Sequence, residues 1–244
     1  MIIAHLSDLH IDSSKEVIYG INPLKNLQRA VSVLQENKNI SIGVITGDIS
    51  NDGSIDSYIK ADEVLSLLPF PVIITNGNHD EAEALLHTEF YKIKYEPFYT
   101  FNNTDFITVN TVVKAEDGKN RSTGIITPHE LSLLKDRIIK SRNKIIILMH
   151  HPATTSGSWL DKRILCNRND FYNTIALSQN IIAVLSGHNH YPTNERIGNI
   201  LLSTAPSVST TFDKDLKPFE EAFKPGFNII NTDNGVCSVE TIFL

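Results

Sequence analysis

Residues 72–80 read VIITNGNHD, and this stretch carries much of the information about the fold. Its first four residues are all β-branched, which predicts a short buried strand. The strand ends abruptly in Asn-Gly-Asn-His-Asp, where Asn78, His79 and Asp80 are three consecutive side chains able to bind a metal ion or a proton. Consecutive side chains cannot all point the same way, so we expect the three to have different tasks.

Outward from this stretch, apolar runs that end in polar residues recur along the chain. Further strands are predicted at Ile2–Leu6, Ile42–Thr46, Phe106–Asn110, Lys144–Met149, Ile181–Leu185, Ile200–Ser203, Phe227–Asn231 and Val236–Phe243. The last two flank TDNG, residues 232–235, which is a hairpin signal. The segment Lys92–Phe101 is compatible with a strand or with a segment that borders the site.

Helical patterns lie between the early strands. Apolar residues at helical spacing predict helices over Leu24–Leu34 and Ile55–Leu68. The sequence TPHE, residues 127–130, offers an N-cap, a proline at N1 and a glutamate at N3, so a helix should run from there towards Lys140. Strands that alternate with helices before a strand-rich end predict an α/β fold. No linker or repeat divides the chain, so we expect residues 1–244 to form one domain.

Composition excludes several classes of function. The chain has a net charge of −6 and a pI of about 5.8, which argues against binding to long nucleic acid. A small anionic substrate remains compatible, because bound divalent cations can reverse the local field. The two cysteines form no CxxC pair, and no apolar stretch approaches the ~20 residues of a membrane span. We therefore expect a cytoplasmic protein that does not contact membranes.

Polar ligands follow five of the predicted strands. In chain order they are Asp8 and His10, Asp48, Asn78 with His79 and Asp80, His150 with His151, and His188 with His190. The carboxyl ends of strands form the ligand crevice in open α/β sheets, so these side chains should meet. Imidazoles and carboxylates without thiolates suit Mn, Fe, Zn, Co or Ni better than Mg or Ca. The set has more ligands than one ion needs and fits two ions about 3.5–4 Å apart.

The five blocks DxH, GD, GNH[DE], H and GHxH occur here in this order between residues 8 and 190. In this respect the chain resembles the calcineurin-like metallophosphoesterases. The resemblance implies a four-layer α/β/β/α sandwich with two divalent or mixed-valence ions of Mn, Fe or Zn. It implies one ion held by Asp8, His10, Asp48 and His190, and a second held by Asp48, Asn78, His150 and His188. Asp48 would then bridge the two ions.

Within that family, the chain looks most like the class III cyclic nucleotide phosphodiesterases. The similar segments are HLSDLHI (5–11), VITGDISNDGSIDSY (44–58), HHP (150–152) and the region that begins APSVSTTF (205–212). The GDxxDR signature of the Ser/Thr protein phosphatases is missing, because no arginine follows Gly47-Asp48. The resemblance implies hydrolysis of a small phosphodiester, above all a 3′,5′-cyclic nucleotide.

Alternatives are a phosphomonoesterase, a nucleotide pyrophosphatase or a nuclease of the same fold, or a non-catalytic scaffold. Many members dimerise, so a homodimer is compatible with the resemblance.

The hydrolysis of a diester sets tasks for particular residues. Two ions would neutralise the anionic oxygens and make a bridging hydroxide near pH 7. The alkoxide leaving group needs a proton, and His79 is the candidate donor because neither ion needs it as a ligand. Asp80 is the second candidate catalytic residue. We expect it to orient His79 or to cap a helix that begins near Glu81.

Other polar and aromatic residues have two interpretations each. His151 could touch substrate or have a structural role, and Asn189 could approach substrate or face solvent. Trp159 follows the His150 strand in a loop, where it could stack on a nucleobase or pack within the loop. His5 is expected to be a buried histidine with a hydrogen-bond partner.

Overall fold

The structure is a computed structural model that describes residues 1–116, 118–212, 215, 224–233 and 235–244. Its described strands form two six-stranded sheets. The first sheet, in the order β12-β11-β1-β2-β3-β4, contains β1 (Ile2–Leu6), β2 (Ile40–Thr46), β3 (Val72–Thr75), β4 (Ile93–Lys94), β11 (Gly226–Asp233) and β12 (Val236–Phe243). The second, in the order β5-β6-β7-β8-β10-β9, contains β5 (Phe98–Phe101), β6 (Thr104–Val109), β7 (Lys144–Met149), β8 (Ile181–Ser186), β9 (Thr193–Ile197) and β10 (Ile200–Thr204).

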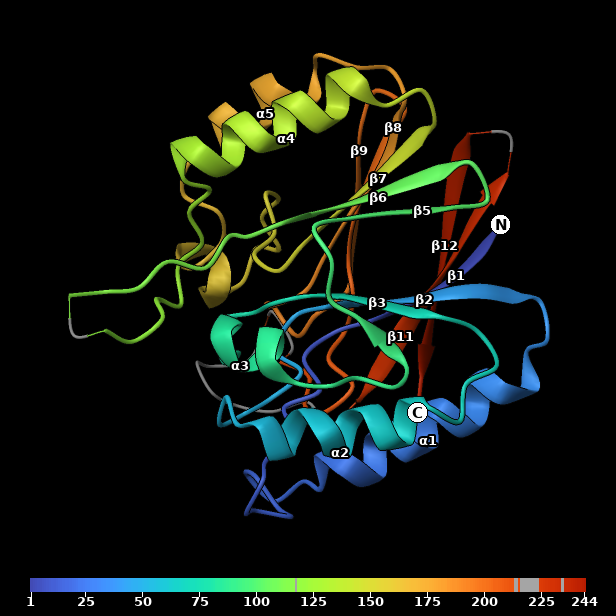
Figure 1. The fold of residues 1–244 in the computed structure, drawn as a ribbon, viewed down its shortest axis with the longest axis vertical. Helices are drawn as coiled ribbons and strands as arrows, with labels where there is room; N and C mark the ends of the chain where they lie inside the picture. Colours follow the sequence, from blue (N-terminus) through green and yellow to red (C-terminus); the bar gives the residue numbers. More distant parts are fainter. Residues whose placement is uncertain (117, 213–214, 216–223, 234) are drawn as a thin grey trace.

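Helices cover the outer faces of the two sheets, so the molecule has four layers (Figure 1). The helices α1 (Pro23–Glu36), α2 (Ile55–Leu65) and α3 (Ala82–His87) pack on the first sheet. The helices α4 (Pro128–Lys140) and α5 (Arg168–Ile175) pack on the second. A third apolar cluster lies between the sheets. The predicted α/β/β/α sandwich is confirmed. Within the described residues, no helix combines the length and the apolar character needed to cross a membrane.

Strand β7 shows why several strands read as continuous apolar runs. Ile145, Ile147 and Met149 face the helices, whereas Ile146 and Leu148 face the other sheet. A strand buried on both faces needs apolar residues at every position rather than at alternate ones. The apolar runs are thus the sequence signature of the inner two layers.

Most predicted elements are present, although the ends of both early helices and of several strands differ from the predicted ones. Strands β1, β3, β7 and β12 have the predicted bounds. The helix predicted over Ile55–Leu68 ends at Leu65, and its last residues form tighter turns in which Leu68 N–H donates to the Leu65 carbonyl. Pro69 follows Leu68 and disfavours helical backbone at the residue before it, which accounts for the early end. The helix cap at Thr127 is confirmed, since its side chain accepts from Glu130 N–H.

Some elements had no clear sequence signal. Strand β9 and helix α5 were not predicted, and Lys92–Phe101 contains two short strands that belong to different sheets. That segment crosses from one sheet to the other and contributes no residue to the lining of the cavity beside the candidate metal ligands. Strands β11 and β12 pair antiparallel as the TDNG signal predicts, although Asn234 of that turn lies outside the described residues.

The topology brings the five predicted strand ends to one place. Strands β1, β2 and β3 run parallel in the first sheet, and β7 and β8 run parallel in the second. The two sheets are joined where these strands end, because His150 Nδ1 donates to the Thr46 carbonyl at 2.7 Å and His188 N–H donates to Asp8 Oδ2 at 3.0 Å. Ligands from both sheets can therefore meet in one site.

Candidate metal centre

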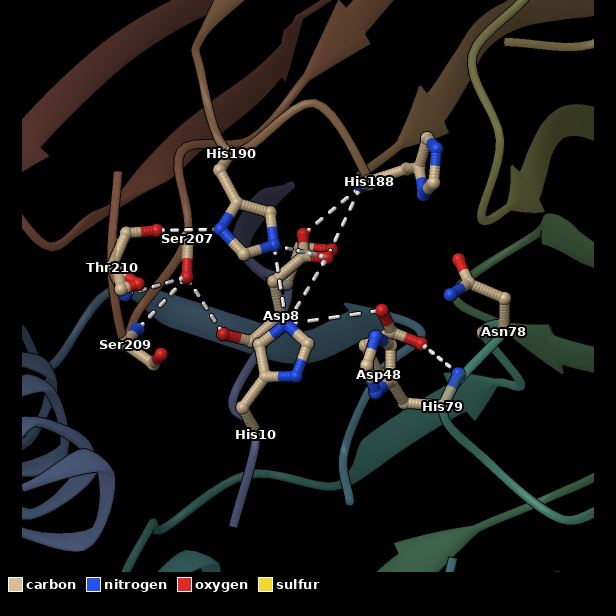
Figure 2. A network of polar contacts seen from close by, with 12 residues as sticks. Asp8, His10, Asp48, Asn78, His79, His188, His190, Ser207, Ser209 and Thr210 are labelled. Carbon is tan, nitrogen blue, oxygen red and sulfur yellow. Dashed lines mark hydrogen bonds and ion pairs between the residues drawn. The ribbon is translucent and has the colours of Figure 1, made fainter. Parts of the chain in front are cut away.

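The predicted ligands converge although they come from residue 8 to residue 190 (Figure 2). Many of them lie on unusual backbone. The φ angles are 54° at Asp8, 49° at His10, 51° at Asp48, 69° at His188 and 52° at His190. Left-handed backbone is costly for residues other than glycine, and such strain concentrates at functional sites. The residue pairs Asp8/His10 and His188/His190 thus reach the site on left-handed backbone rather than as continuations of extended strands.

The first cluster consists of Asp8, His10 and His190. His190 Nε2 lies 3.3 Å from Asp8 Oδ1 and 3.1 Å from His10 Nε2. These separations are close to the ~3.0–3.4 Å between neighbouring ligand atoms around an ion with bonds of about 2.1 Å. Asp48 adjoins the cluster, with its Oδ2 atom 3.8 Å from His10 Nε2.

The second cluster lies around His150. Its Nε2 atom is 3.1 Å from Asn78 Oδ1 and 3.4 Å from Asp48 Oδ2. His188 stands beside it, with ring centroids 5.1 Å apart, and the buried Nε2 atom of His188 has no hydrogen-bond partner among the described residues. The same oxygen of Asp48 therefore faces an imidazole of each cluster. Asp48 lies between them, as the resemblance implies for a shared carboxylate.

Backbone carbonyls fix the orientation of two of the imidazoles. His150 Nδ1 donates to Thr46 O and His190 Nδ1 donates to Thr210 O, each at 2.7 Å. The lone pair of each neutral ring is then on Nε2, which faces the cluster. Lone pairs of His190, His10 and Asp8 that point into one space repel each other unless a cation lies between them. The donor set therefore fits a divalent metal ion in each cluster.

The electrostatics favour charged carboxylates beside neutral imidazoles. Burial lowers the pKa of His10 to about 3, although the carboxylate of Asp48 opposes the shift. Burial also lowers the pKa of His188 well below its usual value, and His151 adds to that effect. Burial would raise the pKa of Asp48, but nearby imidazoles, foremost His150, hold it well below its usual range. Ionised carboxylates and neutral imidazoles are the forms that bind metal.

His190 and His150 are the exceptions, and their carboxylate partners explain why. Burial would lower the pKa of His190, but the carboxylate of Asp8 outweighs burial and raises it. His150 is paired with Asp48 in the same way. Burial alone would lower the pKa of this imidazole, but the carboxylate of Asp48 outweighs burial and raises it to about 9. A proton on His150 would thus neutralise Asp48 across the 3.4 Å between Nε2 and Oδ2. A divalent ion placed between the same two atoms would supply that positive charge instead.

Two glycines of the motifs are required by close packing. A Cβ added to Gly77 would lie 2.2 Å from Asp48 Oδ1, and one added to Gly187 would lie 1.8 Å from Ser7 Oγ. Gly77 does not have left-handed backbone, so a positive φ is not what requires glycine here. Gly77 instead leaves room for the carboxylate that lies between the two clusters.

The variant Gly77→Ala is expected to bind metal poorly, because the added methyl group must displace Asp48 or the β3 loop. Overpacking of this kind costs about 1–3 kcal/mol of stability. Metal content and thermal unfolding would measure both effects. Gly198→Ala is the control, since its left-handed φ of 58° carries a backbone cost but the new methyl group meets nothing within 4 Å. A Gly77→Ala protein with full metal content would contradict the packing argument.

His79 lies at the exposed rim of the site. Its backbone N–H donates to Asp48 Oδ1 at 2.8 Å, and its ring stands edge-on to His10 with centroids 4.8 Å apart. Its Nδ1 atom is 3.4 Å from the Asn51 carbonyl, which orients the ring only loosely. The side chain therefore borders the cavity while the backbone supports the central carboxylate.

Asp80 has different partners from those expected. Its buried carboxylate accepts hydrogen bonds from the N–H groups of Ile49 at 3.3 Å, Ser50 at 2.9 Å and Gly77 at 2.8 Å. No hydrogen bond between its side chain and the His79 ring is described, and helix α3 begins after Glu81 without a side-chain cap. Burial, together with the negative charge of Asp48, raises the pKa of Asp80 to about 7. Asp80 thus ties the loop after β2 to the loop after β3.

A cavity of about 220 Å³ opens onto the candidate ligands. Trp159 lines it. His151 is fully buried, with Nδ1 2.7 Å from Thr111 Oγ1, and it offers a ligand atom within 4.8 Å of those of His150 and His188. Asn189 is buried and does not face solvent. His5 is buried as predicted, with Nε2 3.0 Å from Thr46 Oγ1.

The segment after β10 contributes to the site in a way that sequence reasoning missed. Ser207 Oγ donates to the Asp8 carbonyl at 2.8 Å, and the Thr210 carbonyl accepts from His190 (Figure 2). Phe212 stacks on His190 with ring centroids 4.8 Å apart. The small hydroxyl residues of APSVSTTF at a strand end were the available signal, but they resemble an ordinary loop.

A four-layer sandwich that gathers imidazoles, carboxylates and an amide at the ends of both inner sheets is the architecture of a metal-dependent phosphoric ester hydrolase. Residues 1–192 match the model of the family described as calcineurin-like phosphoesterase. The chain belongs to that family. Its members use a dinuclear metal site, which agrees with the two adjoining clusters.

Sequence comparison with individual proteins gives relatives that are named cyclic nucleotide phosphodiesterases. The chain is 34% identical over 212 residues to a probable cyclic nucleotide phosphodiesterase of Coxiella burnetii, covering 84% of this chain and 82% of the relative. It is 26% identical over 238 residues to the 3′,5′-cyclic adenosine monophosphate phosphodiesterase CpdA of Haemophilus influenzae, covering 93% and 84%. A dimetal phosphatase from Danio rerio shares the fold, with a TM-score of 0.71 at 13% identity over 100% of this chain and 98% of that one.

Proposed function

We propose that the chain is a dinuclear phosphodiesterase that hydrolyses a small diester, foremost a 3′,5′-cyclic nucleotide. The observation that carries this proposal is the position of Asp48, whose Oδ2 atom lies 3.8 Å from His10 Nε2 and 3.4 Å from His150 Nε2. A carboxylate between two donor clusters suits a pair of ions that act on one phosphate group. The names of the relatives support the substrate class.

The ligand sets of the proposal follow the two clusters. One ion is held by Asp8, His10, Asp48 and His190, and the other by Asp48, Asn78, His150 and His188. Imidazole, carboxylate and amide donors favour Mn, Fe or Zn. Because the ligands lie between residues 8 and 190 and Thr210 orients one of them, we infer that residues 1–244 act as one domain.

When bound, two such ions neutralise charge on the phosphate and provide a nucleophile near neutral pH. The chain itself supplies positioning and protons. His79 borders the cavity beside Asn78 and is the proposed donor of a proton to the leaving oxygen. Asp80 acts as a positioning residue, because its carboxylate holds the backbone N–H groups on either side of the ligands Asp48 and Asn78.

The cavity and the charge of the chain fit a small substrate. About 220 Å³ is less than the ~300–1,000 Å³ typical of pockets for drug-sized ligands. A net charge of −6 also argues against a basic surface along which a nucleic-acid duplex could bind. We therefore do not expect long nucleic acid or a membrane as partner, and we expect a cytoplasmic enzyme. A homodimer stays a prediction that measurement of the mass in solution would test.

Removal of metal tests the function directly. Chelation is expected to abolish hydrolysis of 3′,5′-cyclic AMP, and Mn²⁺ added back should restore it. A comparison of kcat/KM between bis- and mono-p-nitrophenyl phosphate should favour the diester. A preference for the monoester would instead indicate a phosphomonoesterase, and a Mn²⁺-loaded protein inert on all three substrates would indicate a scaffold.

A further inference from the structure

We propose that the part of the cavity lined by Trp159, Phe212 and Tyr19 is a subsite for a nucleobase. The inference rests on the proposed function, because it assumes that the substrate's phosphate lies at the metal clusters. It adds that the enzyme selects diesters that carry a flat aromatic base over diesters of glycerol or simple alcohols.

The aromatic wall begins at a candidate metal ligand. Phe212 stacks on His190 at an interplanar angle of 17°, and Trp159 meets Phe212 edge-on with ring centroids 5.7 Å apart. Ile18 and Leu160 line the same cavity. A substrate whose phosphate lies at the metal clusters therefore extends its next group along aromatic and aliphatic side chains. Any nucleobase can stack favourably on such side chains, because every base has a π-face.

The loop that carries Trp159 is held in place by its own hydrogen bonds. Asp161 accepts from the N–H of Ser156 at 2.8 Å and from the N–H of Gly157 at 2.9 Å. Ser158 caps the short 3₁₀ helix η1 (Trp159–Lys162) by accepting from Leu160 N–H at 3.2 Å. A preorganised aromatic side chain loses little entropy when a ligand binds, so this loop suits recognition.

Tyr19 reaches the same cavity from a tight turn between β1 and α1. Ile18 and Ile21 exchange two backbone hydrogen bonds of 2.8 and 2.9 Å, and Tyr19 and Gly20 between them have φ angles of 50° and 83°. Two left-handed central residues define a rigid turn of type I′. Tyr19 is 81% exposed yet lines the cavity, which places an aromatic ring at its mouth.

Arg163 gives the wall a hydrogen-bonding edge. Its guanidinium lines the cavity and donates to Ser122 Oγ at 3.0 Å, which uses one of its five N–H donors. The remaining donors suit the ring nitrogens and carbonyl oxygens of a base, which are acceptors. Its positive charge also attracts the anionic diester in a chain whose net charge is −6.

Intrinsic fluorescence offers a specific test, because Trp159 is the one tryptophan of the sequence. Titration of the metal-loaded protein with 5′-AMP should quench its emission to a saturating level. Ribose 5-phosphate, which has the same phosphate and sugar but no base, should leave the emission nearly unchanged. An equal response to the two compounds would overturn the proposal, whether or not the protein hydrolyses any diester.

The variant Trp159→Leu tests the same subsite through kinetics. The KM for 3′,5′-cyclic AMP should rise about tenfold or more with kcat preserved, because base stacking contributes to binding rather than to bond cleavage. The KM for glycerophosphocholine, a diester without a base, should not change. Tyr91→Leu is the matched control, since Tyr91 is 85% exposed and is not among the residues lining the cavity.

The outcomes separate the subsite from the proposed function. An unchanged KM for cyclic AMP in Trp159→Leu, or equal rises in KM for both diesters, would overturn the subsite alone. A wild-type protein that hydrolyses neither diester would overturn the proposed function, and the fluorescence titration would still decide the subsite. Metal content measured for each variant would show whether a loss of folding accounts for the kinetics.

Discussion

The variant Asp48→Asn is expected to lose at least ~10³-fold in kcat/KM and to bind fewer metal ions than the wild type. The asparagine side chain would keep the shape of the aspartate but lose its negative charge. In the proposed site, the ions of both clusters depend on that charge. Each ion contributes several kcal/mol of transition-state stabilisation, and 1.4 kcal/mol is a tenfold change in rate. Loss of the shared carboxylate weakens both ions, so its effect should exceed that of a ligand to one ion.

Metal binding by Asp48→Asn can be measured independently of turnover. Excess Mn²⁺ should raise the melting temperature of the wild type, because a ligand at 1,000 times its Kd adds about 4 kcal/mol to stability. The variant should gain much less. The matched control is Asp105→Asn, which alters a buried carboxylate outside the site that accepts from Ser141 Oγ at 2.6 Å and Asn143 Nδ2 at 2.9 Å. Equal stabilisation of the wild type and Asp48→Asn by Mn²⁺ would contradict the proposal that Asp48 is a ligand shared by both ions.

The sequence predicted the inner sheets well because burial on both faces leaves a distinct pattern. Runs such as Lys144–Met149 need apolar residues throughout, and polar residues can follow them only where the sheet ends. The approximate location of the site could therefore be predicted from the sequence. The assignment of strands to two sheets was not, because β3 and β7 have similar sequences but belong to different layers.

Details that depend on local backbone geometry could not be predicted from the sequence. Left-handed φ angles at Asp8 and His188 are uncommon for residues other than glycine, so the spacing of the motifs does not predict them. The partners of Asp80 were missed because three backbone N–H groups from two distant loops leave no side-chain signature. Phe212 was missed for a related reason, since its contact with His190 joins residues that are separated by two strands.

The variant His79→Ala is expected to keep its metal ions yet lose about 10²–10⁴-fold in kcat on 3′,5′-cyclic AMP, the usual contribution of a positioned proton donor. The ring of His79 borders the cavity and offers a ligand atom within 4.8 Å of those of His10 and Asp48. The proposed ligand sets of both ions are complete without it. The backbone N–H that donates to Asp48 Oδ1 at 2.8 Å remains in the variant, so the central carboxylate should keep its orientation. The loss should therefore fall on proton transfer rather than on metal binding.

The leaving group decides between this role and a merely structural one. p-Nitrophenolate leaves readily without a proton, so His79→Ala should retain most of its activity on bis-p-nitrophenyl phosphate while activity on cyclic AMP, whose leaving group is an alkoxide, collapses. A structural role would lower both rates together. His129→Ala, at an exposed histidine on α4, is the control for the loss of an imidazole and should leave both rates unchanged. Equal losses on the two substrates, or a loss of metal, would remove His79 from proton donation and leave that task to another group.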